Sequence, residues 1–137
     1  MTGNEYQKLA MRTNDGQSRN RLYMHLYNRP FSIHPNPDTA TLLEGCLGLS
    51  GEVGEFNDVI KKWIFHNHEL STTDVVRELG DILWYISLIC HSLSLDMDKI
   101  MLENICKLQD RYPDGFDTQR SINRDDDSRN GREYHES

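Results

Sequence analysis

The chain has 137 residues, of which 36% are apolar, and it carries a formal net charge of −7. This length and composition predict one domain with a small core. The acidic balance argues against a general nucleic-acid binder or an anionic-membrane binder, because both need a basic surface.

The first predicted helix covers residues 4–13, where apolar side chains gather on one face. Residues 14–18 include a glycine and are expected to break this helix. Residues 21–28 can then form another turn or two of helix. The prolines of residues 30–37 predict an irregular or extended connection, because proline restricts its own backbone and that of the residue before it.

A long helix is predicted to follow, beginning at Asp38 or Thr39 as the N-cap and ending at about Phe65. It contains four glycines, at positions 45, 48, 51 and 54. Each glycine costs about 1 kcal/mol in a helix interior. They predict either a kink near residues 48–51 or the close approach of a neighbouring element, and we favour close packing.

The next helix is predicted to run to about His91, after Ser71 and Asp74, which resemble a capping box with Asp in place of Glu. Its segment ILWYISLIC is apolar nearly all round. One face is therefore expected to pack within the chain and another to meet a second subunit. Core packing is expected, in preference to base stacking, of three aromatic residues, Trp63, Trp84 and Tyr85.

A fourth helix is predicted from a cap at Ser94 or Asp96 to about Arg111, where the sequence YPDGF forces a turn. Residues 1–112 are expected to form a helical domain. Residues 113–137 are expected to be a turn and a polar, largely flexible tail, with at least the last dozen residues disordered. Strand-like alternation is absent, so the predicted class is all-α.

The three cysteines, Cys46, Cys90 and Cys106, are odd in number and have no metal-ligand spacing. They are predicted to be reduced core residues. The first residues are polar and lack a signal-peptide core, and the longest apolar run is too short to span a bilayer. A cytoplasmic protein with no membrane partner is therefore expected.

Two acidic pairs of equal spacing stand in the two central predicted helices: Glu52 with Glu55, and Glu78 with Asp81. In a helix, residues three apart lie roughly 60° apart around the axis, so each pair points one way. Their segments are otherwise rich in apolar residues, where ionised groups need compensation. Carboxylate oxygens alone suit Mg²⁺, with Mn²⁺ able to substitute. The sequence therefore predicts a divalent-metal site.

Three polar residues of the fourth predicted helix, Asn104, Lys107 and Arg111, recur at spacings of three and four. They therefore share one face, which can line a phosphate chain. Lys62 lies on the same side of its helix as Glu55 and can also reach the site. Acids that hold metal beside such a basic stripe suit a di- or triphosphate substrate, with activated water as the nucleophile.

Two neighbouring features have alternative interpretations. Asp58 continues the acidic stripe and can bind a second metal, but pairing with Lys61 or Lys62 is at least as well supported. His66 and His68 suggest zinc, yet no further ligand is spaced to join them, so they are predicted to be solvated turn residues.

The ordered motifs GLSGEVGEFNDVIKK, RELGDILWYISLI and ENICKLQDRYPDGF resemble those of the MazG-type nucleoside triphosphate pyrophosphohydrolases, in particular the small single-domain versions of phages and bacteria. The resemblance covers about residues 4–124. The family's ExxE followed by ExxD matches Glu52, Glu55, Glu78 and Asp81. It implies that these four acids are catalytic and hold Mg²⁺.

The resemblance also implies a four-helix-bundle-like fold that assembles as a homodimer or homotetramer. It implies cleavage of a nucleoside triphosphate between the α- and β-phosphates, giving a monophosphate and pyrophosphate. Two alternatives stay open. One is a non-catalytic metal-binding helical bundle, although di-iron bundles use Glu-x-x-His pairs that this sequence lacks. The other is an inactive oligomeric scaffold of the same fold.

Overall fold

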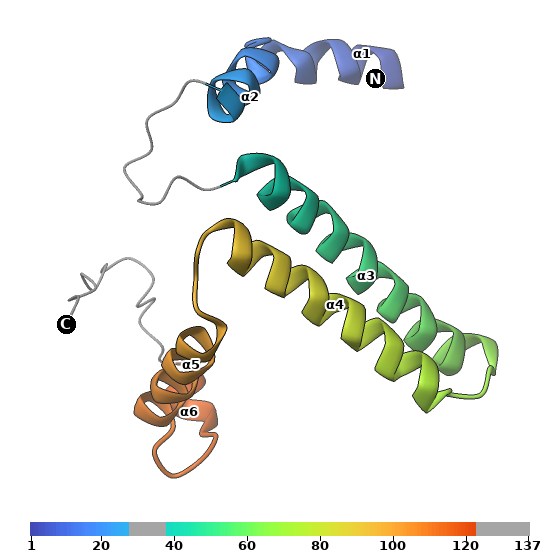
Figure 1. Ribbon diagram of the computed structural model, residues 1–137. Coiled ribbons are helices and arrows are strands. Elements are labelled where there is room, and N and C mark those ends of the chain that lie inside the picture. Colours follow the sequence, from blue (N-terminus) through green and yellow to red (C-terminus); the bar gives the residue numbers. More distant parts are fainter. Residues whose placement is uncertain (28–37, 123–137) are drawn as a thin grey trace. The chain divides into compact units, whose positions relative to one another are not determined.

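The computed structural model describes residues 1–27 and 38–122, and all regular secondary structure within these residues is helical (Figure 1). The all-α prediction is therefore confirmed. Contacts divide the chain into two compact units, the first ending at Leu95 and the second beginning at Asp96. The connection predicted at residues 30–37 and the tail predicted to be disordered lie outside the described residues.

The N-terminal segment forms α1 (Gly3–Ala10), a 3₁₀ turn (Met11–Thr13) and α2 (Ser18–Tyr27). A capping box starts α1. The Thr2 hydroxyl accepts a hydrogen bond from the Glu5 backbone N–H (3.2 Å), and the Glu5 carboxylate accepts one from the Thr2 N–H (2.6 Å). The first predicted helix is confirmed, and α2 begins earlier than the sequence predicted.

The long helix α3 spans Thr39–His66. Asp38 caps it, because its side chain accepts hydrogen bonds from the backbone N–H groups of Ala40 and Thr41 (3.1 and 3.2 Å). Asn67 ends it in the left-handed conformation, with φ at 55°. The predicted bounds of this helix are confirmed.

Helix α4 (Thr72–Ser92) runs back antiparallel beside α3, and the two helices form a hairpin (Figure 1). The Ser71 hydroxyl caps α4 by accepting a hydrogen bond from the Asp74 backbone N–H (3.2 Å). The predicted capping residue and the predicted end of the helix are both confirmed.

Two of the four α3 glycines are explained by the close approach of α4. A Cβ atom on Gly45 would lie 2.7 Å from Cγ1 of Ile89, and one on Gly48 would overlap the Tyr85 ring. Helix α3 continues as one helix through all four glycines. Close packing is confirmed at Gly45 and Gly48, which let α4 lie directly against the α3 backbone.

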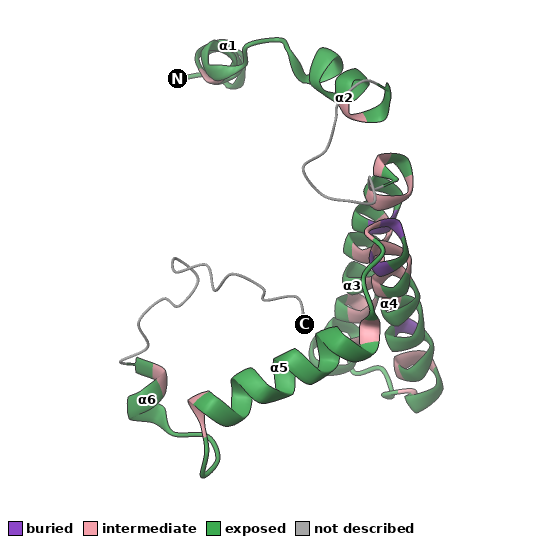
Figure 2. Ribbon diagram, turned by 60° about the vertical axis from the view of Figure 1, so that its left-hand side comes forward, coloured by how far each residue is buried: buried purple, intermediate pink, exposed green. Residues whose placement is uncertain are grey.

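The hairpin leaves much apolar surface uncovered. Cys90 is the one buried apolar side chain among the described residues, and Figure 2 shows the buried positions on α3 and α4. All three cysteines are free, but Cys46 and Cys106 are exposed, so their predicted core location is wrong. Trp63 and Trp84 are 46% and 56% exposed, which corrects the core role predicted for them. Two helices share only one face, so the hairpin by itself covers one side of each helix.

The second unit contains α5 (Met97–Arg111) and the short α6 (Thr118–Ile122). Asp96 caps α5, because its side chain accepts hydrogen bonds from the backbone N–H groups of Asp98 and Lys99 (2.9 and 3.4 Å). Gly115, with φ at 99°, forms the predicted turn. The sequence did not predict α6, which lies within the segment expected to be a flexible tail. The domain boundary predicted after residue 112 stays a prediction.

Within the second unit, three apolar residues of α5 at helical spacing, Met101, Ile105 and Leu108, are 54%, 51% and 41% exposed. A helical apolar stripe is buried only where another layer covers it. Among the described residues, no helix is both long enough and apolar enough to cross a membrane.

Candidate functional site

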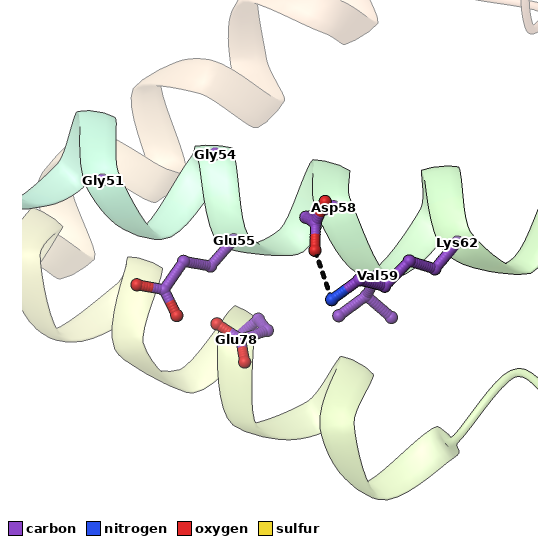
Figure 3. A pocket seen from close by; sticks show the side chains of 7 residues that line it. All are labelled: Gly51, Gly54, Glu55, Asp58, Val59, Lys62 and Glu78. Carbon is purple, nitrogen blue, oxygen red and sulfur yellow. Dashed lines mark ion pairs between the residues drawn. The ribbon is translucent and has the colours of Figure 1, made fainter. Parts of the chain in front are cut away.

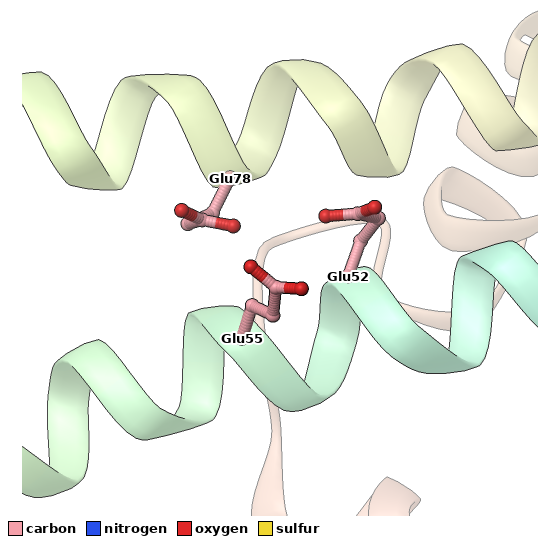
Figure 4. Close-up of side chains that lie close together, drawn as sticks. All are labelled: Glu52, Glu55 and Glu78. Atoms are coloured by element: carbon pink, nitrogen blue, oxygen red, sulfur yellow. The ribbon is translucent and has the colours of Figure 1, made fainter.

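The packing of α3 against α4 brings the two acidic pairs together. Gly48 lies against Tyr85. Because the helices are antiparallel, the residue two turns after Gly48 on α3 lies opposite the residue two turns before Tyr85 on α4. Those positions are Glu55 and Glu78. One carboxylate oxygen from each of Glu52, Glu55 and Glu78 lies within 4.8 Å of the other two (Figure 4). We call these three residues the acidic cluster.

Glu78 is the most buried member of the acidic cluster, with 8% of its surface exposed, whereas Glu52 is half-buried and Glu55 is exposed. Within the described part of the chain, no hydrogen bond or ion pair reaches the Glu78 carboxylate. A carboxylate on so largely buried a residue loses part of its hydration, and a cation bound by oxygen ligands would offset that cost. The donor set therefore fits a hard divalent cation.

The electrostatics of Glu52 reflect all four predicted acids. Burial raises the pKa of Glu52 first of all, and the negative charges of Glu55, Asp81 and Glu78 raise it further. Asp81 is exposed and lies outside the acidic cluster, although its charge acts on Glu52. The structure thus brings three of the four predicted acids together and leaves the fourth beside them on α4.

A pocket of about 470 Å³ opens beside the acidic cluster, between α3 and α4 (Figure 3). It is lined by Gly51, Gly54, Glu55, Asp58, Val59, Lys62 and Glu78. Lys62, which was predicted to reach the site, therefore shares this pocket with two members of the cluster. The pocket combines carboxylates, a cation and bare helix backbone, which suits a polar ligand that carries negative charge.

Asp58 is held by two lysines. Its carboxylate pairs with Lys61 and, at 2.6 Å, with Nζ of Lys62. The hydrogen bonds from Lys61 and then Lys62 lower the pKa of Asp58 to about 2, and the same contact raises the pKa of Lys62. Asp58 was considered as a ligand of a second metal or as a partner of Lys61 or Lys62, and the structure shows the pairing with lysine.

Gly51 and Gly54 are pocket residues whose role the sequence did not indicate. A Cβ atom added to either would meet no atom within 4 Å, so close helix packing, which explains the two earlier glycines, is wrong for these two. Both precede an acid of the first pair, Glu52 and Glu55. Their position directly before these acids was the only signal in the sequence. The structure was needed to distinguish glycines that pack against α4 from glycines that line the pocket.

Asn104, Lys107 and Arg111 all lie on α5, at the predicted helical spacing. Asn104 and Lys107 are exposed, and Arg111 is half-buried. Nε of Arg111 is buried and lacks a hydrogen-bond partner among the described residues, while the Arg111 backbone oxygen accepts a hydrogen bond from Arg120 (3.5 Å). Because α5 belongs to the second unit, the approach of these three residues to the acidic cluster stays a prediction.

His66 and His68 are exposed at the end of α3, with ring centroids 6.4 Å apart. Among the described residues, the group of side chains able to share a metal ion contains only acids and neither histidine. The predicted exposure of both histidines is confirmed, with His66 as the last residue of α3 and His68 after the Asn67 cap.

Comparison with known proteins gives two matches. A family model for the MazG nucleotide pyrophosphohydrolase domain matches residues 41–116, more than half of the chain, and this range contains all four predicted acids. The "Gene 37 protein" of Mycobacterium phage L5 is 29% identical over 92 residues, which cover 61% of this chain and 81% of that protein. No solved structure matches the chain.

Proposed function

This chain belongs to the MazG nucleotide pyrophosphohydrolase domain family, and we propose that it hydrolyses a (deoxy)nucleoside triphosphate between the α- and β-phosphates to a nucleoside monophosphate and pyrophosphate. Membership supports nucleotide pyrophosphohydrolase activity in general. The single observation that carries the finer proposal is the convergence of carboxylates from two helices beside a pocket that also contains Lys62.

The proposed metal ligands are Glu52, Glu55, Glu78 and Asp81, and the proposed metal is Mg²⁺, with Mn²⁺ able to substitute. The acidic cluster offers oxygen ligands only, which suits these hard cations. A bound divalent cation would supply Lewis-acid chemistry and lower the pKa of water. The chain's own contribution is to hold Glu78 fixed by burial while Glu55 stays accessible to a ligand in the pocket.

Four polar residues are proposed to hold the substrate's phosphates: Lys62, Asn104, Lys107 and Arg111. Lys62 supports this role because it lines the pocket with Glu55 and Glu78. Its partner Asp58 also pairs with Lys61, so Asp58 keeps one counter-charge when Lys62 turns toward a phosphate oxygen. Charge-assisted hydrogen bonds to phosphate are about twice as strong as neutral ones.

Lys107→Ala and Arg111→Ala should each weaken triphosphate turnover while metal binding is retained. Loss of one charge-assisted contact costs roughly 1.5 to 3 kcal/mol, or about ten- to a hundredfold in kcat/KM. Arg111→Lys should recover only part of the loss, because lysine keeps the charge but lacks the bidentate fork. Steady-state kinetics with Mg²⁺ measure both effects. Values within about twofold of the parent for both alanine variants would mean that the stripe is a solvated helix end.

We propose a homodimer or homotetramer as the working assembly. The outer face of α4 carries three exposed apolar residues at spacings of three and four, Val76, Leu79 and Leu83 (63%, 44% and 56% exposed). Such a stripe resembles the seam of packed helices, and a second copy of α4 or α3 can cover it. Sedimentation at micromolar concentration reports the assembly directly.

Turnover of purified protein against common and modified nucleoside triphosphates tests the proposed function. Hydrolysis should require Mg²⁺ or Mn²⁺ and stop when a chelator removes the metal. If the protein binds Mg²⁺ and hydrolyses no nucleotide, the alternative of a non-catalytic metal-binding bundle or an inactive scaffold holds instead.

A further inference from the structure

Asp58 and Lys62 lie four residues apart on α3, and both line the pocket (Figure 3). One carboxylate oxygen of Asp58, Oδ2, lies 2.6 Å from Nζ of Lys62, and the other, Oδ1, pairs with Lys61. Lys61 is exposed and does not line the pocket. The ammonium group of Lys62 is therefore already paired with an anion that lines the same pocket.

The charges that line the pocket do not favour an anion by themselves. Among the described lining residues, three carry carboxylates, Glu55, Asp58 and Glu78, and one carries a cation, Lys62. Their formal net charge is −2, which a divalent cation would cancel. Like charges brought together in a partly buried site repel each other. A phosphate anion that arrives without a metal ion is therefore repelled by this pocket.

The pair of Asp58 with Lys62 stays charged at neutral pH. Hydrogen bonds from Lys61 and then Lys62 lower the pKa of Asp58 to about 2, and the hydrogen bond with Asp58 raises the pKa of Lys62. A phosphate oxygen has to compete with the Asp58 carboxylate for the Lys62 ammonium group. Because Lys61 also pairs with Asp58, the carboxylate keeps a counter-charge when Lys62 is released to a ligand.

We propose that Asp58 is a specificity-determining residue, which holds Lys62 and keeps the pocket anionic, so that phosphate groups bind only together with a divalent cation. This inference rests on the proposed function for the identity of the anion, and it adds a residue that discriminates between metal-loaded and metal-free phosphate. A repulsive group directed against the wrong ligand is a general means of specificity. Removal of the Asp58 charge should therefore strengthen metal-free binding through Lys62.

Calorimetry with inorganic tripolyphosphate, in Mg²⁺ and in a chelator, tests this role. The parent should bind tripolyphosphate in Mg²⁺ and bind it about tenfold more weakly, or less, in the chelator. Asp58→Asn keeps the shape of the side chain and removes its charge, so the metal-free affinity should rise about tenfold. In Asp58→Asn combined with Lys62→Ala, the metal-free affinity should return to about the parental value, because the gain acts through Lys62.

Asp74→Asn is the matched control. Asp74 is a half-buried aspartate of α4 that pairs with Arg77 at 3.2 Å, at the same helical spacing as Asp58 with Lys61, and it lies outside the pocket. This variant should keep the tripolyphosphate affinity within about twofold of the parent in both conditions. If Asp58→Asn loses helical content by circular dichroism, Asp58→Ala should show the same gain, because alanine favours the helix.

Several results would overturn the proposal. Equal parental affinity in Mg²⁺ and in the chelator, or no binding in Mg²⁺, would mean that the pocket does not select metal-loaded phosphate. Unchanged metal-free affinity in both Asp58→Asn and Asp58→Ala would remove the discriminating role of Asp58. Weaker binding of Mg²⁺ itself by these variants would make Asp58 a metal ligand instead. If the binding results hold and the parent hydrolyses no nucleotide, the proposed function alone fails.

Discussion

Replacing Glu78 with glutamine should reduce turnover about a hundredfold or more, because a metal site supplies several kcal/mol of transition-state stabilisation and this is its most buried ligand. The same change should raise the melting temperature of the metal-free protein. Glu78 is 8% exposed beside two other carboxylates, and removing its charge removes both a burial cost and a repulsion. Thermal unfolding with and without Mg²⁺ measures the second effect.

A matched control is available on the same hairpin. Glu44 is an exposed acid of α3 outside the acidic cluster, so Glu44→Gln should leave both turnover and the Mg²⁺-dependent rise in melting temperature unchanged. Glu52→Gln, Glu55→Gln and Asp81→Asn should behave like Glu78→Gln. If two or more of these four acid variants kept full turnover, the metal-site assignment would be wrong.

Gly48→Ala should destabilise the protein, although alanine favours a helix over glycine by about 1 kcal/mol. The new Cβ atom would overlap the Tyr85 ring, whose neighbour Trp84 lies edge-on with ring centroids 4.8 Å apart. Overpacking of this kind costs about 1 to 3 kcal/mol, and moving α4 outward would also separate Glu55 from Glu78. Both the free energy of unfolding and turnover should therefore fall.

Urea denaturation followed by circular dichroism measures the stability part of that prediction. Gly80→Ala is the matched comparison, because Gly80 is an exposed glycine of α4 at which a Cβ atom meets nothing within 4 Å. It should gain stability from helix propensity alone. A Gly48→Ala protein as stable as the Gly80→Ala protein would mean that the Gly48 contact with Tyr85 does not hold the helices in register.

The helix bounds could be predicted because they depend on local chemistry. Asp38, Ser71 and Asp96 each accept a hydrogen bond from backbone N–H groups of the first turn of the helix they precede. Each cap involves a side chain and a backbone N–H group no more than three residues apart, so it can be predicted from the local sequence. The spacing of the two acidic pairs is equally local, so a shared carboxylate site was predictable from Glu52, Glu55, Glu78 and Asp81.

What could not be predicted depends on how separate segments pack. Whether Trp84 is covered depends on the number of layers around α4, and helical spacing does not report that number. Gly48 and Gly54 look alike in the sequence, yet one faces an aromatic ring and the other an open pocket. The acids of one pair also separate: Glu78 joins the acidic cluster, whereas Asp81 lies beside it.

Product analysis tests the central claim most directly. Purified protein, Mg²⁺ and a hydrolysable nucleoside triphosphate are incubated, and the first products are separated by ion-exchange chromatography, with Glu78→Gln as the control for a contaminating activity. The proposed chemistry predicts equal amounts of nucleoside monophosphate and pyrophosphate, with no diphosphate intermediate and almost no product from the variant. Nucleoside diphosphate and orthophosphate as the primary products would contradict it.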